Sequence, residues 1–184
     1  EAVDLEADSL TFAATSKSGL QSIDRLNKVV GSSGSKLTDY IFTNDANLAV
    51  DAGTGADVIR IVDTTAGAAY SLTGGSDSDQ LICNAGQDTL LGADGQDYLE
   101  GGTNNDILDG GSDHDMLIAG SGEDYLDGGS GEDYLDGGAD NDLLLGGSGR
   151  DILIGDSGND MLAGMQDPDK YVFDDGWGHD TIIG

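Results

Sequence analysis

A nine-residue period governs the middle of this chain. Read in steps of nine from Gly74, ten consecutive segments run to Ala163, and each has aspartate at the sixth position and leucine at the eighth. The aspartates are Asp79, Asp88, Asp97, Asp106, Asp115, Asp124, Asp133, Asp142, Asp151 and Asp160. The leucines are Leu81, Leu90, Leu99, Leu108, Leu117, Leu126, Leu135, Leu144, Leu153 and Leu162. A period this short and regular indicates a solenoid, in which each repeat packs only on its neighbours.

Each nonapeptide divides into a turn and a strand. Positions one to five are mainly Gly, Ser, Asn and Asp, which favour tight turns and tolerate positive φ. Positions seven to nine are long enough for a very short strand, whose eighth residue points away from the side of the seventh and ninth. Two turns and two strands make one coil of 18 residues. Stacked coils are therefore expected to bury the leucines between two parallel sheets.

The charge of the chain is extreme. Of 184 residues, 36 are acidic and 7 basic, which gives a net charge of −29, and no Lys or Arg occurs between Ile61 and Gly149. Such a surface repels phosphate backbones and anionic membranes, so no nucleic acid partner is expected. No apolar run approaches the roughly 20 residues of a transmembrane segment. With 5% aromatic residues, the composition is typical of a disordered segment unless cations neutralise it.

Stacking coils would place the position-six aspartates on top of one another. Residues one coil apart lie at the strand spacing of about 4.8 Å. Two unit charges about 4 Å apart repel by roughly 1 kcal/mol in water, and several-fold more at a lower effective dielectric constant. The carbonyl groups of the turns face the same gaps. Carboxylate and carbonyl oxygens in a flexible loop favour Ca²⁺ over Mg²⁺, so we interpret the acids as a metal ladder.

The repeated segments, such as GGSGEDYLD at residues 128–136, resemble the nonapeptides of the repeats-in-toxin (RTX) family. Members of that family are secreted by Gram-negative bacteria through type I systems. Weaker copies flank the core: AGTGADVIR has Asp57 in the sixth place and GMQDPDKYV has Asp169. The segment YVFDDGWGHDTI resembles the one that closes many such arrays, and it contains Asp180 two residues out of register.

The resemblance implies an all-β fold, a right-handed parallel β-roll (β-solenoid) of nonapeptide repeats. Three regions follow from it: a non-repeat flank at residues 1–73, the roll at residues 74–172, and the start of a carboxy-terminal capping segment at residues 173–184. In the family, each Ca²⁺ lies between one turn and the next turn on the same side. The position-six aspartates of both turns hold it, together with main-chain carbonyls from the first four positions.

Carried over to this chain, the resemblance implies about eight calcium ions. The expected carboxylate ligands are the ten position-six aspartates of the core and Asp169. The glycines expected to surround the ions are Gly92, Gly95, Gly101, Gly110, Gly111, Gly120, Gly122, Gly128, Gly129, Gly131, Gly137, Gly138, Gly146, Gly147, Gly149, Gly155 and Gly158. Some turns depart from the pattern, with Cys83 and Asn84, Ala93, Ala119 and Asp156 in glycine positions. Strain is expected there.

The flank before the repeats lacks the period. Leu20, Ile23, Leu26 and Val30 are spaced three or four residues apart and are followed by Gly31, which predicts one amphipathic helix. The segments SLTF, DYIF, DVIRIV and AAYSL predict strands around it. We therefore expect a small mixed α/β segment that caps the open edge of the first coil.

The outward position-seven side chains form two apolar rows. One row is Tyr98, Met116, Tyr134 and Ile152, and the other is Ile107, Tyr125, Leu143 and Met161. Such a row marks a contact with a cell-surface receptor or with the rest of a parent protein. It is equally the ordinary composition of exposed strand positions. Both interpretations remain open.

No HExxH or GxSxG motif occurs, so this chain is expected not to be an enzyme. The absence of an initiator methionine suggests a piece of a longer protein. The resemblance implies a secreted, extracellular module that stays unfolded in the low-calcium cytosol, passes through the type I secretion machinery, and folds on binding Ca²⁺ outside. The alternative is a ligand-binding module that recognises a receptor or a carbohydrate.

Overall fold

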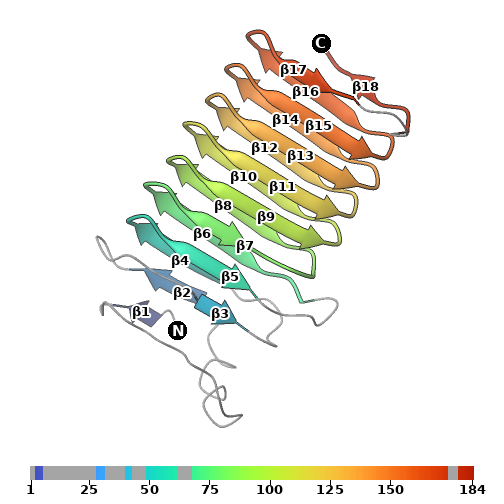
Figure 1. Cartoon of the computed structure of the whole chain (residues 1–184). Coiled ribbons are helices and arrows are strands. Elements are labelled where there is room, and N and C mark those ends of the chain that lie inside the picture. The colour runs from blue at the N-terminus through green and yellow to red at the C-terminus, as the bar shows by residue number, and fades with distance from the viewer. Residues whose placement is uncertain (1–2, 6–27, 32–39, 43–48, 62–67, 174–177) are drawn as a thin grey trace.

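The computed structural model describes residues 3–5, 28–31, 40–42, 49–61, 68–173 and 178–184. All regular elements in these residues are β-strands, and they stack into a single solenoid that runs from the N-terminal to the C-terminal end (Figure 1). The repeats thus form the all-β parallel solenoid that their period predicts. No helix in the described part of the chain has the length and hydropathy to cross a membrane.

Successive strands belong alternately to two parallel sheets. The larger sheet contains, in spatial order, β1 (Val3–Leu5), β2 (Lys28–Gly31), β4 (Ala49–Thr54), β6 (Ser71–Ser76), β8 (Thr89–Asp94), β10 (Ile107–Ser112), β12 (Tyr125–Ser130), β14 (Leu143–Ser148), β16 (Met161–Gln166) and β18 (Thr181–Ile182). The smaller sheet contains β17 (Lys170–Val172), β15 (Ile152–Ser157), β13 (Tyr134–Ala139), β11 (Met116–Ser121), β9 (Tyr98–Thr103), β7 (Gln80–Ile82), β5 (Val58–Ile61) and β3 (Tyr40–Phe42). A strand and the next one along the chain therefore lie on opposite sides of the core.

The position-eight leucines form the core between the sheets. Neighbouring strands pair in the register of the repeat, so that Leu126 lies beside Leu108 on one side and Leu144 on the other. All ten of these leucines have 0% exposed surface. Full burial of a leucine side chain contributes roughly 1.5–3 kcal/mol, so this column supplies the main apolar stabilisation of the roll. The predicted leucine core is confirmed.

The strands are longer than the sequence suggests. We expected strands of three residues at positions seven to nine, whereas most core strands span six, as in Tyr125–Ser130. The additional residues are the first three positions of the following nonapeptide, which pair in parallel with the same positions one coil away, as Gly129 does with Gly147. Small residues at these positions let the backbone of one coil lie close to the next.

The flank before the repeats departs from the expectation of a helix. Lys28–Gly31 is a strand, so the helix prediction is wrong for residues 28–30, and the earlier residues of the predicted helix lie outside the described part. The strands predicted in DYIF and DVIRIV are confirmed as β3 and β5. In AAYSL the strand begins only at Ser71, and SLTF lies outside the described residues.

Both sheets continue across the start of the repeats. Val50 of β4 pairs with Leu72 of β6, and Ile59 of β5 pairs with Leu81 of β7. These partners are farther apart in sequence than the repeat requires, yet their side chains are buried in the same core. The division at residue 73 and the capping role of the flank stay predictions.

A candidate metal site between stacked turns

The position-six aspartates line the two turn sides of the solenoid in two columns. One column is Asp79, Asp97, Asp115, Asp133 and Asp151, and the other is Asp88, Asp106, Asp124, Asp142 and Asp160. Each of them is 1–4% exposed. Carboxylates are rarely buried this completely unless a partner compensates their charge.

One oxygen of each carboxylate has a main-chain partner. The N–H of Asp115 donates to Oδ1 of Asp133 at 2.8 Å, and the N–H of Asp106 donates to Oδ1 of Asp124 at 2.6 Å. The same bond joins every pair of position-six aspartates of the core that lie 18 residues apart; we call each of these aspartates a rung. It also reaches the weaker copies, where Asp57 donates to Asp79, Asp151 to Asp169 and Asp160 to Asp180. The weak copies at both ends of the array therefore extend the ladder.

The second oxygen differs from the first in nine of these aspartates. Oδ2 is buried and accepts no hydrogen bond in Asp79, Asp97, Asp106, Asp115, Asp124, Asp133, Asp142, Asp151 and Asp160. A buried acceptor left unsatisfied costs about 1–3 kcal/mol, and more when it is charged. Because buried polar atoms in native proteins almost always have partners, a repeated orphan of this kind points to a ligand that the carboxylates bind.

The pKa values of these carboxyl groups also show that their negative charge lacks a partner. Burial raises the pKa of Asp106, Asp115 and Asp142 from 3.8 to about 8, and that of Asp79 and Asp133 to about 7. The hydrogen bond from the preceding rung lowers each value in part, and the neighbouring carboxylates raise it again. The charged form is therefore unfavourable in this fold without a cation.

Main-chain oxygens lie close to the orphaned atoms. A Cβ built on Gly128, at position one, would lie 2.7 Å from Oδ2 of Asp133 and 2.6 Å from the carbonyl oxygen of Gly146, one coil further. A carboxylate oxygen and a carbonyl oxygen from successive turns thus surround one point. The remaining position-one glycines of the predicted set also border the Oδ2 atom of their own repeat. The glycines at positions two and four lie instead over carbonyl groups of the preceding coil.

The side chains alone do not complete a metal site. Nowhere in the described ranges do three or more His, Cys, Asp or Glu side chains come together in a metal-binding arrangement. An ion between two rungs would therefore have two carboxylates and would need main-chain carbonyls for the rest of its coordination. Hard oxygen ligands in this mixture fit Ca²⁺, which takes six to eight oxygens at about 2.3–2.6 Å.

Two of the turns that depart from the glycine pattern keep the positive φ that glycine has at position two. Ala93 and Asp156 occupy position two with φ of 84° and 68°, where glycines such as Gly111 have φ of 102°. A positive φ in a residue with a Cβ costs of order 1 kcal/mol or more, so the expected strain is present at Ala93 and Asp156. Ala119 at position one is fully buried, and its strand β11 keeps six residues.

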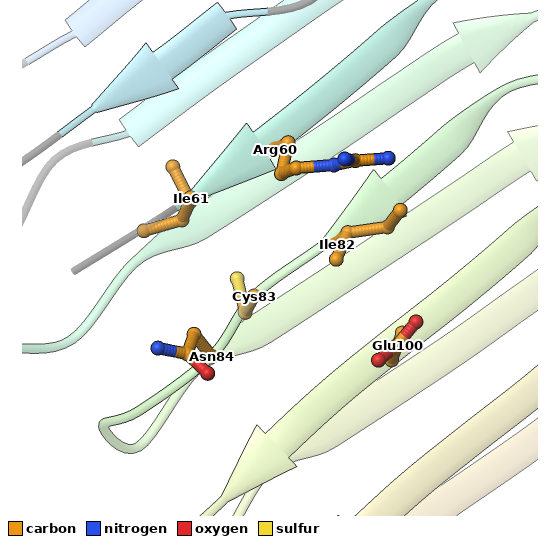
Figure 2. Close-up of a pocket in the computed structure, with 6 residues that line it drawn as sticks. All are labelled: Arg60, Ile61, Ile82, Cys83, Asn84 and Glu100. Carbon is orange, nitrogen blue, oxygen red and sulfur yellow. The ribbon is translucent and has the colours of Figure 1, made fainter. Parts of the chain in front are cut away.

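The turn that begins at Cys83 differs more. Strand β7 ends at Ile82, and the following turn contributes only an isolated bridge between Ala85 and Thr103. Cys83 itself is buried, and this burial raises the pKa of its thiol above the ordinary value. A shallow pocket of about 380 Å³ opens beside it and is lined by Arg60, Ile61, Ile82, Cys83, Asn84 and Glu100 (Figure 2). None of the position-six aspartates lines this pocket, so it is separate from the metal gaps.

The nine-residue period identifies the aspartates, but it does not show that the two oxygens of each carboxylate have different surroundings. The period placed the rungs one above another, while it could not show that Oδ1 accepts the N–H of the preceding rung and Oδ2 stays available. Nor did it separate position-one glycines, which border the carboxylate, from the others. The signal was present in the residue types, because only position one is filled by Gly, Ala or Cys throughout the core.

Comparisons with known proteins agree with this geometry. The sequence model of the RTX calcium-binding nonapeptide repeat matches four times, at residues 73–108, 109–144, 127–162 and 136–170. Neither the curated proteins nor the solved structures compared with the chain include a significant match. Together the four matches cover more than half of the chain, within the described solenoid. The chain belongs to the family of RTX calcium-binding nonapeptide repeat proteins.

Proposed function

We propose that this solenoid is a calcium-driven folding module, whose chain is unfolded without Ca²⁺ and folds when the ions enter the gaps between rungs. The observation that carries the proposal is the repeated orphan: a buried, unpaired Oδ2 at successive rungs of both columns. The ion pair between Arg150 and Glu132 is exposed and involves no position-six aspartate. Folding and cation binding are then one process.

The proposed ligands follow from the site. Two successive position-six carboxylates hold each ion, together with carbonyl oxygens of the two turns, such as that of Gly146. The core repeats provide about eight such gaps. The rungs at Asp57, Asp169 and Asp180 extend the same hydrogen-bonded ladder and offer further gaps at its ends. When bound, Ca²⁺ supplies the positive charge that lets the carboxylates stay ionised in the fold.

In this proposal the chain folds outside the cell, where the calcium concentration is in the range that extracellular modules bind. Extracellular modules bind Ca²⁺ with dissociation constants of about 10⁻⁴–10⁻³ M. A chain that is unfolded by self-repulsion in the cytosol passes a type I export channel and then folds in external calcium, where folding hinders its return. In this proposal the module is structural, not catalytic, and it supports the export and folding of a larger secreted toxin, adhesin or enzyme.

Circular dichroism with and without calcium tests the proposal. In excess chelator the far-ultraviolet spectrum should be that of an unfolded chain, and calcium should restore a β spectrum in a cooperative titration. Mg²⁺ at the same concentration serves as the control, because its smaller size and strict octahedral geometry suit the mixed oxygen site poorly. An identical β spectrum in chelator would falsify the proposal.

A further inference from the structure

We propose that the outer face of the larger sheet docks a cationic, partly apolar segment of a partner protein. The docking face consists of Ile107, Tyr125 and Leu143, with Asp109 and Asp127 beside them. The inference requires the folded solenoid, but it does not depend on how many ions the turns hold. It goes beyond calcium-driven folding, which leaves this face unused.

The apolar part of the docking face is a continuous row. Ile107, Tyr125 and Leu143 pair in register on the adjacent strands β10, β12 and β14, and Ile107 is 47% exposed. A groove of about 390 Å³ runs along the turn side of the row, where Asn105, Glu123 and the position-six aspartates Asp88, Asp106 and Asp124 also line it. An apolar row with a polar rim is typical of an interaction site, although exposed strands also favour such residues. The acids beside the row decide between these interpretations.

Asp109 and Asp127 are direct neighbours on β10 and β12. Like charges in this position destabilise a sheet. Asp127 accepts a hydrogen bond from the hydroxyl of Tyr125 at 3.3 Å. Ile107 lies two residues before Asp109, as Tyr125 does before Asp127, but it has no hydroxyl group to donate. Asp109 forms no hydrogen bond or ion pair within the described ranges. The pair therefore lacks a positive partner.

The surroundings of this pair favour a basic side chain over a metal ion. Along the column the two acids lie between Leu91 and Leu145. Main-chain oxygens in the middle of a sheet are used by the hydrogen bonds between strands, so they do not converge on the carboxylates as they do in the turns. Leucine side chains suit the methylene stem of Lys or Arg, whose charged end would then reach the two carboxylates.

The charge of the chain also determines which occupant fits. A second copy carries the same net charge of −29 and would bring Asp109 and Asp127 against identical acids. A partner segment with Lys or Arg beside apolar residues satisfies both parts of the face. The expected occupant is therefore a basic segment of another protein.

The smaller sheet provides a matched control face. Its outward row is Tyr98, Met116, Tyr134 and Ile152. Its acids Glu100 and Asp136 are separated in register by Ile118, and each accepts a hydrogen bond from a tyrosine hydroxyl, at 2.9 and 3.3 Å. This face has a similar apolar row and similar charges, but Glu100 and Asp136 do not lie directly opposite another acid in the register.

Binding of a short fluorescent peptide of alternating leucine and lysine, measured by anisotropy in calcium buffer, tests the proposal. The double variant Asp109→Asn plus Asp127→Asn should bind it about tenfold more weakly than the original protein. The control, Glu100→Gln plus Asp136→Asn, removes the same charge and should change affinity less than about twofold. Equal losses in both variants would show non-specific attraction to an acidic protein and would overturn the proposal.

A second pair of variants tests the apolar row. Ile107→Ser plus Leu143→Ser should weaken binding of the leucine–lysine peptide about tenfold, whereas Met116→Ser plus Ile152→Ser should not. A peptide of serine and lysine with the same charge should bind the original protein more weakly than the leucine–lysine peptide. Equal binding of the two peptides contradicts the role of the row.

Two further readouts separate the remaining outcomes. Circular dichroism in calcium must show the same β spectrum for all variants, which keeps a loss of docking distinct from a loss of folding. Light scattering of the protein alone in calcium should give a monomer. A dimer that the Ile107→Ser plus Leu143→Ser variant abolishes would mean that the face pairs with itself, and the proposed partner would be wrong.

Discussion

A position-six aspartate performs two tasks with two oxygens. In Asp133, Oδ1 accepts the N–H of Asp115 and so connects one coil to the next, while Oδ2 is buried without a hydrogen bond. The first contact needs only an oxygen acceptor, and asparagine would preserve it. The second requires negative charge wherever a cation binds. Substitution by asparagine therefore separates the structural role of the residue from its role as a ligand.

Asp133→Asn should raise the calcium concentration needed for folding, because in the proposed function Asp133 helps to bind the ions above and below it. We expect the calcium-bound state to lose about 2–4 kcal/mol of stability, as measured by urea unfolding in saturating calcium. Glu132→Gln is the control, since this exposed acid pairs with Arg150 at the surface and its loss should leave stability nearly unchanged. Equal effects of the two variants would argue against Asp133 as a ligand.

Position two tests backbone strain in one residue. Ala93→Gly should stabilise the calcium-bound protein by about 1 kcal/mol, because glycine adopts the observed φ of 84° without steric cost. The reciprocal change, Gly111→Ala, has a φ of 102° and brings a Cβ against the carbonyl oxygen of Ala93, so it should destabilise by more than that. Urea unfolding in saturating calcium measures both. Stabilisation by Gly111→Ala would contradict the assignment of strain.

At the scale of the strand, alternation decides which side chains hold the roll together. In β13, Leu135 points into the core with 0% exposure, while Tyr134 and Asp136 on either side point outward. A six-residue strand has only one large apolar residue in the core, since the other inward positions belong to the small residues of the next turn. Each strand therefore depends on the strands beside it in its sheet and across the core.

Leu135→Ala should cost about 2–5 kcal/mol of unfolding free energy, because the rigid leucine column cannot close the cavity that it leaves. Tyr134→Ser, at the adjacent outward position, should cost less than about 1 kcal/mol. Thermal unfolding in saturating calcium followed by circular dichroism distinguishes them. A larger effect of Tyr134→Ser would mean that the outer face, not the leucine column, carries the stability.

The period in the sequence predicted the repeated elements well and the flank poorly. Leu126 in the core and Asp124 at a rung follow from alternation and from like positions stacking, and both are where the period requires. The six-residue strands were not predicted, because glycine-rich positions carry a turn signal even when they pair in a sheet. Val30 was assigned to a helix from its apolar spacing alone, and the pairing of β2 with β4 overrides that local preference.

At the scale of the whole molecule, the roll behaves as a stack of buried acids whose stability depends on what neutralises them. Raised pKa values are found along both columns, for example in Asp115 and Asp106. A cation removes the penalty by pairing with the charge, and a proton removes it by abolishing the charge. Calcium and acid should therefore act on the same equilibrium.

In the absence of calcium, the solenoid should lose stability as the pH rises. Carboxyls such as Asp115 have a pKa of 3.8 in the unfolded chain and about 8 in the fold, so the folded state binds more protons throughout this interval. Stability is greatest below the unfolded value and declines as the pH rises towards the folded value. In chelator, circular dichroism should show more β structure at about pH 5.5 than at about pH 8. The opposite trend would contradict the raised values.

The hydrogen bonds between position-six aspartates all point the same way along the solenoid. Each coil offers carboxylate oxygens to the coil before it and N–H groups to the coil after it, as Asp133 does towards Asp115 and Asp151. The solenoid is consequently a polar rod with chemically different ends, one ending in acceptors and the other in donors. Two such rods are complementary only head to tail, so tandem arrays of these repeats in one chain can grow into a longer rod without a change of direction.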